Sequence, residues 1–193
     1  MNKKVIITFF IMLVVAAAAI GGFFVLSRYV NEDASKVTET SELGKLLNKD
    51  LESAYPATPR EVVKFYNRIN SIMYGGEVTE EQFSDLLKQM RQLFDEELLA
   101  ENDFEKQLEE FSKDVKDYEE NSKSIVSYNL PENSLVNHYK KDGAEMASLD
   151  VGYMLKEKDE YTKMTEEFIL RQDAEGKWKI LGWSLKTEEG KEK

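Results

Sequence analysis

In the segment Met146-Ala147-Ser148-Leu149-Asp150-Val151-Gly152-Tyr153-Met154-Leu155, every second side chain from Ala147 onward is apolar. Successive side chains of a β-strand point to opposite faces of the sheet, so this alternation predicts a strand with one apolar face and one mixed face. Four further segments are predicted as strands, at 124–130, 135–141, 161–171 and 177–186. The connections at 141–143, 156–160 and 173–176 are short and rich in turn residues, so the strands on either side of each connection are expected to pair antiparallel.

Three helices are predicted before the strands, each beginning with residues that satisfy the free amides of a first helical turn. Thr58-Pro59-Arg60-Glu61 combines a capping hydroxyl, a proline at the first helical position and a glutamate three residues after the cap. Thr79-Glu80-Glu81-Gln82 repeats this capping pattern, and apolar residues then recur three and four apart as far as Leu98. The third helix is expected to begin at Asn102 and to carry apolar residues as far as Tyr118. Helices followed by a run of strands predict an α+β domain, in which three helices pack on an antiparallel sheet of about five strands.

The longest apolar run lies near the start of the chain. Val5 to Leu26 spans 22 residues without a charge, and Thr8 is its only polar side chain. At about 1.5 Å per helical residue the run reaches roughly 33 Å, enough to cross a hydrocarbon core about 30 Å thick. The alternative is a secretory signal cleaved after Ala17-Ala18-Ala19. Cleavage there would leave an exposed apolar end, so the sequence favours an uncleaved transmembrane anchor.

The anchor divides the chain into parts with different expected roles. These are a cytoplasmic head at 1–4, the transmembrane anchor at 5–26, a polar stalk with a short helix at 27–54, the α+β domain at 55–186 and a charged tail at 187–193. A head of four residues before a large domain is typical of a signal anchor, so the domain is expected outside the cytoplasmic membrane. Four leucines at helical spacing in the stalk predict a short amphipathic helix that either lies on the domain or binds a partner. They are Leu43, Leu46, Leu47 and Leu51.

Composition excludes several classes of function. The residues after the anchor contain 24 of the 26 basic side chains and all 37 acidic ones, a net charge of −13. Such a charge opposes binding to nucleic acid or to an anionic bilayer surface and favours cationic partners. The sequence has no cysteine, so it offers no disulfide, thiolate metal ligand or cysteine nucleophile. It also lacks a phosphate-binding loop and the spacings typical of metal ligands or a nucleophile elbow, so no catalytic residue, metal or cofactor is predicted.

The last predicted hairpin and the first long helix resemble known families. The hairpin reads Phe168-Ile169-Leu170-Arg171-Gln172-Asp173-Ala174-Glu175-Gly176-Lys177-Trp178-Lys179-Ile180-Leu181-Gly182-Trp183. It resembles the last hairpin of the nuclear transport factor 2-like superfamily, where an Asp/Gly turn precedes Trp-Lys-Ile on the final strand. The helix and its lead-in read Tyr55-Pro56-Ala57-Thr58-Pro59-Arg60-Glu61-Val62-Val63-Lys64-Phe65-Tyr66-Asn67-Arg68. Together with the hairpin, this segment resembles a family of uncharacterised membrane-anchored proteins of Gram-positive bacteria.

The resemblance covers about 55–185 and implies a cystatin-like cone, in which a bent sheet wraps around the helices. The cone is a ligand pocket in some relatives and is filled by side chains in others. Relatives of this fold include steroid isomerases, polyketide cyclases, accessory domains of cell-wall enzymes and anchored scaffold subunits of secretion channels. The motifs concerned form the fold and are not catalytic, so the resemblance alone assigns no activity.

Six aromatic side chains are candidates for lining a ligand pocket, although the same spacing also fits an ordinary core. They are Tyr66, Tyr74, Tyr153, Phe168, Trp178 and Trp183. The only histidine, His138, has no acid at a suggestive spacing and is assigned a structural or surface role. Asp150 is expected on the strand face that points away from the helices. Of Glu166 and Glu167, at most one can line the mouth of the cone, because adjacent strand residues point to opposite faces.

These features predict a single-pass protein of the cell membrane that displays a non-catalytic binding or interaction domain. Its partner would be an envelope protein or a small ligand. One alternative is an isomerase- or cyclase-like enzyme that uses the cone. Another is a structural envelope scaffold that forms a homodimer through the sheet face around Ser148, Asp150 and Met154. A deep apolar cavity with a desolvated acid would favour the enzyme, whereas a filled cone with a flat exposed sheet would favour self-association.

Overall fold

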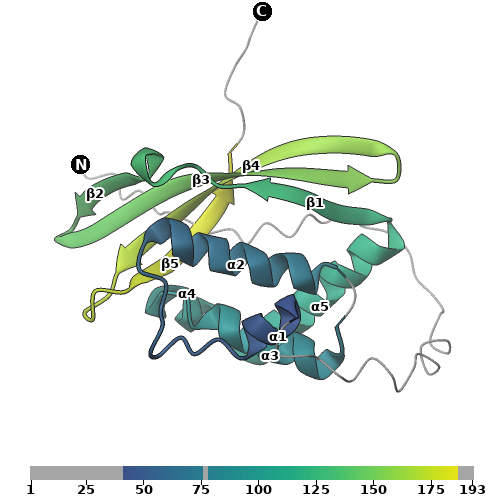
Figure 1. Ribbon diagram of the computed structural model, residues 1–193, viewed down its shortest axis with the longest axis horizontal. Helices are drawn as coiled ribbons and strands as arrows, with labels where there is room; N and C mark the ends of the chain where they lie inside the picture. Colours follow the sequence, from purple (N-terminus) through teal and green to yellow (C-terminus); the bar gives the residue numbers. More distant parts are fainter. Residues whose placement is uncertain (1–40, 76–77, 187–193) are drawn as a thin grey trace, which may run out of the picture.

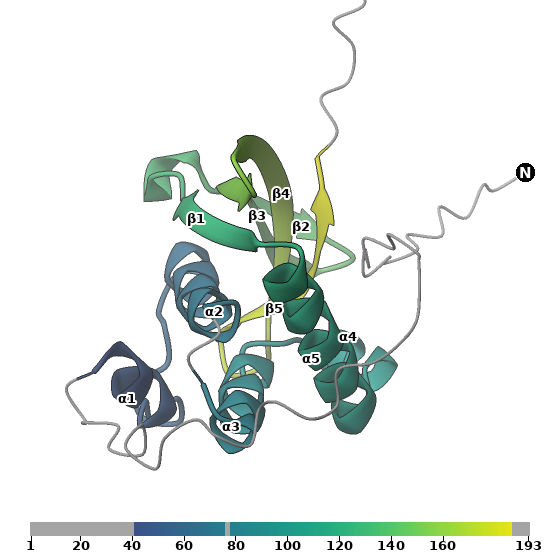
Figure 2. The ribbon, with the colours of Figure 1, turned by 90° about the vertical axis from the view of Figure 1, so that its right-hand side faces the viewer.

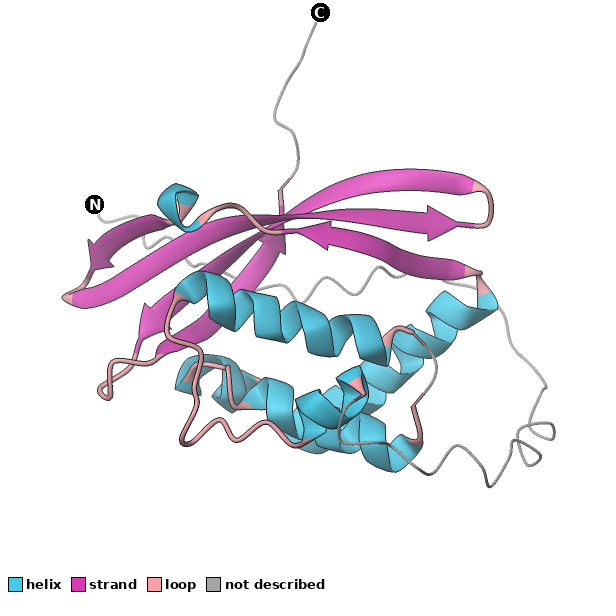
Figure 3. Ribbon diagram, in the orientation of Figure 1, coloured by secondary structure: helices cyan, strands magenta, loops and turns pink. Residues whose placement is uncertain are grey.

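The computed structural model describes residues 41–75 and 78–186, which form an α+β arrangement of two layers. The helices gather on one side of a curved antiparallel sheet (Figure 1, Figure 3). The elements in chain order are α1 (Glu42–Leu47), α2 (Pro59–Met73), α3 (Glu80–Arg91), α4 (Glu96–Glu101), α5 (Phe104–Glu120), β1 (Lys123–Asn129), the 3-10 turn η1 (Asn133–Leu135), β2 (Asn137–Lys141), β3 (Ala144–Glu157), β4 (Glu160–Gln172) and β5 (Trp178–Leu185). The predicted α+β class and the antiparallel five-stranded sheet are confirmed.

The sheet is organised around its two longest strands, β3 and β4. Its strand order is β1-β3-β4-β5. β1 and β2 pair with the same edge of β3, β1 with its last residues and β2 with its first. The three short connections predicted to join antiparallel strands do so, between β2 and β3, β3 and β4, and β4 and β5. Figure 2 shows the sheet above the helical layer, with α2 and α5 nearer to it than α1 and α3. The face toward the helices is called the inner face below, and the opposite one the outer face.

The predicted alternation along β3 sets these two faces. Leu149, Val151 and Tyr153 point inward and are buried, while Asp150 lies on the outer face and is exposed. Ser148 also belongs to the outer row but is only 8% exposed, and the Asn137 amide from β2 lies 3.5 Å from its hydroxyl. The outer face is therefore only partly exposed to solvent. Asn137 of β2 covers Ser148, which belongs to the row expected to be available for homodimer formation.

The helices begin largely where their capping residues predict. Thr58 and Thr79 cap α2 and α3, and the Thr79 box is complete, because the Gln82 side chain accepts a hydrogen bond from the Thr79 amide. The cap of α5 is Asp103 and not Asn102, which instead ends α4. The predicted second helix is too long. The chain leaves α3 after Arg91 and starts a separate α4, although the apolar spacing continues to Leu98.

A backbone contact with the sheet explains the break between α3 and α4. The Ile180 amide of β5 donates to the Leu93 carbonyl at 2.8 Å, and the Asp95 amide donates to the Ile180 carbonyl at 2.8 Å. Backbone groups that pair with a strand cannot also continue an α-helix. Arg171 of β4 reinforces the junction, because its Nε donates to the Asp95 carboxylate at 3.0 Å.

The short helix predicted in the stalk forms as α1, and it lies on the domain. Leu46 is fully buried and Leu51 is 3% exposed, both within the main core cluster. The other predicted parts, at 1–4, 5–26, 27–40 and 187–193, lie outside the described residues. Within residues 41–75 and 78–186, no helix has the length and apolar character needed to cross a membrane.

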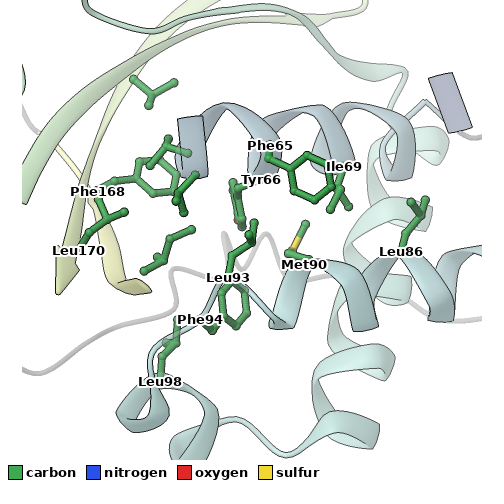
Figure 4. Close-up of a cluster of buried hydrophobic side chains, with 14 of the residues drawn as sticks. Phe65, Tyr66, Ile69, Leu86, Met90, Leu93, Phe94, Leu98, Phe168 and Leu170 are labelled. Atoms are coloured by element: carbon green, nitrogen blue, oxygen red, sulfur yellow. The ribbon is translucent and has the colours of Figure 1, made fainter. Parts of the chain in front are cut away.

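The core lies between the inner face and the helices. Figure 4 shows Tyr66 of α2 in one cluster with Phe168 of β4 and with Phe94, which follows α3. Tyr66 meets Phe168 edge to face at 5.4 Å between ring centroids and lies 6.3 Å from Phe94. Aromatic rings at these distances attract one another beyond the effect of their buried area. This cluster joins three elements that are far apart in the sequence.

Replacement of Thr79 by alanine should lower the free energy of unfolding by about 1 kcal/mol, because it removes the hydroxyl that accepts a hydrogen bond from the Gln82 amide at the start of α3. Urea unfolding of the full chain in detergent measures the change. The exposed Ser134 provides the matched control, and Ser134→Ala should change stability by less than about 0.5 kcal/mol. Equal losses in the two variants would contradict a specific role of the cap.

Candidate functional site

An acidic side chain lies on the inner face of the sheet, among residues that are otherwise apolar or aromatic. Glu166 of β4 pairs across the sheet with Val151 of β3 and Leu185 of β5. Directly opposed residues of neighbouring strands place their side chains on the same face. Val151 is fully buried on that face, whereas Leu185 is 38% exposed, so Glu166 lies where the buried core gives way to solvent. Its own side chain is half-buried.

Glu166 lies near a buried pair of polar side chains that joins the sheet to α2. The Tyr153 hydroxyl, from β3, donates to Asn67 Oδ1 at 2.7 Å, and Asn67 Nδ2 donates to the Val63 carbonyl at 2.9 Å. The charge of the nearby Glu166 contributes to the raised pKa of Tyr153.

The surroundings of Glu166 favour its neutral form. Burial raises the pKa of Glu166 to about 7, and the nearby Tyr153 hydroxyl opposes this effect only in part. No ion pair among residues 41–75 and 78–186 includes Glu166. Burial likewise raises the pKa of Tyr66 and of Tyr153, and the nearby charge of Glu166 adds to both shifts. Near neutral pH the site therefore exchanges between a carboxyl and a carboxylate.

A third tyrosine approaches from α5. Burial is the main cause that raises the pKa of Tyr118 to about 12, and the charges of Asp114 and Glu166 contribute further. The Tyr118 ring meets Tyr74 edge to face at 4.8 Å, and the Tyr74 hydroxyl donates to the Asp114 carboxylate. The charge of Glu166 thus contributes to the raised pKa of tyrosines in α2, α5 and β3.

The aromatic candidates separate into groups. Tyr66, Phe168 and Trp183 pack on one another, with 5.2 Å between Tyr66 and Trp183 and 5.8 Å between Phe168 and Trp183. Tyr153 joins them through Asn67, which is adjacent to Tyr66 in α2. The rings of Tyr66, Phe168 and Trp183 pack directly against one another, as side chains do in a filled core.

The other two aromatic candidates lie apart from this group. Tyr74 belongs to the pair with Tyr118 described above. Trp178 meets the exposed His138 edge to face at 5.5 Å, and its carbonyl accepts a hydrogen bond from the Tyr55 hydroxyl at 2.9 Å. His138 is thus an exposed residue whose ring packs against Trp178.

The two adjacent acids occupy opposite faces, as strand geometry requires. Glu166 lies on the inner face, whereas Glu167 pairs with Asp150 on the outer face and lies 4.0 Å from the Lys186 ammonium. Lys186 also forms an ion pair with Asp150 at 2.7 Å. Asp150 is thus a surface residue with a basic partner and takes no part in the inner site.

Residues 1–183 match a family model described as Domain of unknown function (DUF6715). The chain belongs to this family. The match includes the predicted anchor and extends into β5, so the family covers both parts of the chain as one unit. No curated protein matches the chain.

Two residues of the inner site were not predicted from the sequence. Asn67 interrupts the apolar side of α2, four residues after Val63. A polar residue on a buried helix face needs a hydrogen-bond partner, so this position alone could have identified Asn67 as part of a polar site. Tyr118 was assigned only to the apolar seam of its helix. The part of the chain that the structure describes holds no group of three or more His, Cys, Asp or Glu side chains placed to bind a metal ion.

Proposed function

We propose that this chain is a single-pass membrane protein whose domain, displayed outside the cytoplasmic membrane, binds a small ligand without transforming it. The binding site is formed by Glu166, Tyr153 and Asn67, together with the neighbouring tyrosines. The helical layer against a curved five-stranded sheet supports a nuclear transport factor 2-like cone as the finer description of the fold.

The observation that carries this proposal is the half-buried Glu166 carboxyl on the inner face, near the hydrogen-bonded Tyr153 and Asn67 and beside an aromatic core. Burying an acid lowers stability, and an apolar residue of similar size would pack there at lower cost. Perturbed acids at the border of an apolar region are a physical mark of functional sites, and binding sites commonly combine aromatic walls with a few polar groups.

The hydrogen bonds favour binding over catalysis. An isomerase of this kind needs a carboxylate base opposite a hydroxyl that can donate to a developing oxyanion. The Tyr153 proton is already donated to Asn67, and Tyr66 is 4% exposed and packed against Phe168 and Trp183. Neither hydroxyl is presented to a reacting atom. The second candidate function is an isomerase- or cyclase-like enzyme. One feature favours it: burial raises the pKa of Glu166 to about 7, which suits a general base near neutral pH.

The apolar run from Val5 to Leu26, long enough to cross a bilayer, supports the membrane anchor in this proposal. A reporter fused after Lys193 tests this part of the proposal. Alkaline phosphatase, which needs an extracytoplasmic location, should be active in the fusion. Activity of a reporter that works only in the cytoplasm would refute the proposed topology.

A fragment screen on the full chain in nanodiscs tests the binding function. Compounds that raise the midpoint of thermal unfolding should lose this effect in Glu166→Gln and keep it in Glu167→Gln, whose altered side chain lies on the outer face. Chemical conversion of a bound compound would favour the enzyme candidate. If no stabilising compound distinguishes the two variants, the inner site does not bind ligands of that size.

A further inference from the structure

We propose that a second copy of this chain packs on the outer face of the sheet. In this dimer, Met154 of each copy fills the space over Gly152 of the other, and Lys156 of each copy pairs with Asp150 of the other. The proposal goes beyond ligand binding and does not depend on it, because Glu166 lies on the opposite face of the sheet.

Gly152 lies in the middle of β3, and no contact within the described domain requires a glycine there. The pairing of β3 with β4 is regular along its whole length, and the shift in the pairing with β1 lies beyond Asn129, the partner of Gly152. The described glycines with a positive φ are Gly143 and Gly176. A β-carbon added at Gly152 would meet no atom within 4 Å apart from its chain neighbours. A glycine inside a strand weakens that strand and often marks a place where another chain approaches closely.

A side chain that can fill this space lies two residues further along the same strand. Met154 follows Gly152 in the outer row of β3 and is partly exposed. Two sheets that pack face to face about a two-fold axis bring their strands together in opposite directions when the axis crosses the strands. With that axis between Gly152 and Met154, each methionine lies over the glycine of the other copy. The flexible thioether side chain of methionine suits an irregular space of this kind.

The same axis brings opposite charges together. Asp150 lies two residues before Gly152 in the outer row, and Lys156 lies two residues after Met154, so each Lys156 is placed over Asp150 of the other copy. Asp150 is exposed. No ion pair within residues 41–75 and 78–186 includes Lys156. The second copy therefore supplies an acidic partner to a lysine that has none in its own described domain.

The neighbouring strand β4 repeats this complementarity. Tyr161 pairs with Lys156 across the sheet and is 62% exposed, and Glu167 pairs with Asp150. The axis places Tyr161 over Glu167 of the other copy, where its hydroxyl can donate to the carboxylate. An anionic polymer or membrane would be attracted by Lys156 and repelled by the two acids of the same face. The charge pattern therefore favours a second copy as the occupant.

Sedimentation of the full chain in detergent, over a range of protein concentrations, tests the shape of the contact. The wild-type chain should dimerise, and Gly152→Val should raise the dissociation constant about tenfold or more, because valine occupies the space that Met154 needs. The urea midpoint of Gly152→Val should be unchanged or higher, because its side chain enters open space in the single chain. A wild-type chain that stays monomeric would refute the proposal. So would a variant with a lower midpoint and an intact dimer, since the glycine would then serve the fold.

A mixture of two variants tests the charges independently of Gly152. Lys156→Glu and Asp150→Lys each bring like charges together in both contacts of their own dimer, so each should raise the dissociation constant about tenfold or more. An equal mixture restores both contacts and should form a dimer almost as readily as the wild type. Lys116→Glu, on the exposed surface of α5, is the matched control and should dimerise as the wild type does. A mixture that stays monomeric, or a dimer that neither single variant weakens, would overturn the proposed interface.

Discussion

Replacement of Glu166 by glutamine should raise the free energy of unfolding at pH 8 by about 3 kcal/mol and leave it nearly unchanged at pH 4. Burial raises the pKa of Glu166 from 4.5 in the unfolded chain to about 7 in the folded one. Each unit of difference corresponds to about 1.4 kcal/mol, which gives the stated size. Glutamine has nearly the same shape as the protonated acid and carries no charge at any pH. The variant therefore keeps an uncharged side chain at this buried position even at pH 8.

The direction of the pH dependence follows from proton binding. Between pH 4.5 and about 7 the folded protein holds the Glu166 proton more tightly than the unfolded chain does. The stability linked to this proton is therefore fully present below pH 4.5 and is lost as the pH rises through about 7. The general repulsion among the acidic side chains changes in the same direction, so the informative quantity is the difference between the wild type and the variant.

Urea unfolding of the full chain in detergent, followed by tryptophan fluorescence at pH 4, 5, 6, 7 and 8, measures this difference. Glu167→Gln is the matched control, because it removes the same charge one residue away, on the outer face. Its stability should follow the wild-type curve to within about 0.5 kcal/mol. Parallel curves for wild type and Glu166→Gln would show that the acid is solvated in the folded protein, and the proposed site would lose its main support.

The sequence predicted the sheet well because its signal is local and regular. The alternation from Ala147 to Leu155 identifies both the strand and its buried row, and the structure places Leu149, Val151 and Tyr153 on the inner face. The same rule limits Glu166 and Glu167 to opposite faces. Which of them points inward depends on the pairing register with β3, since a shift of one residue would exchange their positions.

The end of α3 could not be predicted from local pattern. Phe94 and Leu98 continue the helical spacing, and both are buried as that spacing requires. The helix nevertheless ends earlier, because Leu93 and Asp95 form backbone hydrogen bonds with Ile180, a residue distant in the sequence. A contact of this kind leaves no trace in the residues near the break.

The inner site was predicted only in part, for a related reason. Its aromatic members follow from periodicity, but the hydrogen bond from Tyr153 to Asn67 joins a strand to a helix, and Glu166 lies on a third element, β4. Sequence spacing says which residues share a face, and not which side chains meet across two layers. The separation of Trp178 and Tyr74 from the other aromatic candidates has the same origin.

Replacement of Phe168 by alanine should lower the free energy of unfolding by about 3 to 5 kcal/mol, the range for a large aromatic residue removed from a packed core. Phe168 has no exposed surface and stacks on Trp183. It also meets Tyr66 edge to face, within the cluster that Figure 4 shows. Its loss removes buried area and leaves a void between β4 and α2 that this rigid junction of sheet and helix cannot close. Urea unfolding should show the loss, and near-ultraviolet circular dichroism should show a weaker tryptophan signal.

The size of this loss also distinguishes a filled interior from an open pocket. In a filled interior, Phe168→Leu should cost much less than Phe168→Ala, because the cost grows with the volume left empty. The exposed Leu135 is the control, and Leu135→Ala should change stability by less than about 0.5 kcal/mol. If Phe168 instead borders open space, neighbouring atoms make fewer contacts with it, and truncation to alanine should cost less than about 2 kcal/mol. That result would place a ligand pocket beside Phe168. A loss of about 3 kcal/mol or more would instead restrict ligand binding to the partly exposed end of the inner face, around Glu166 and Leu185.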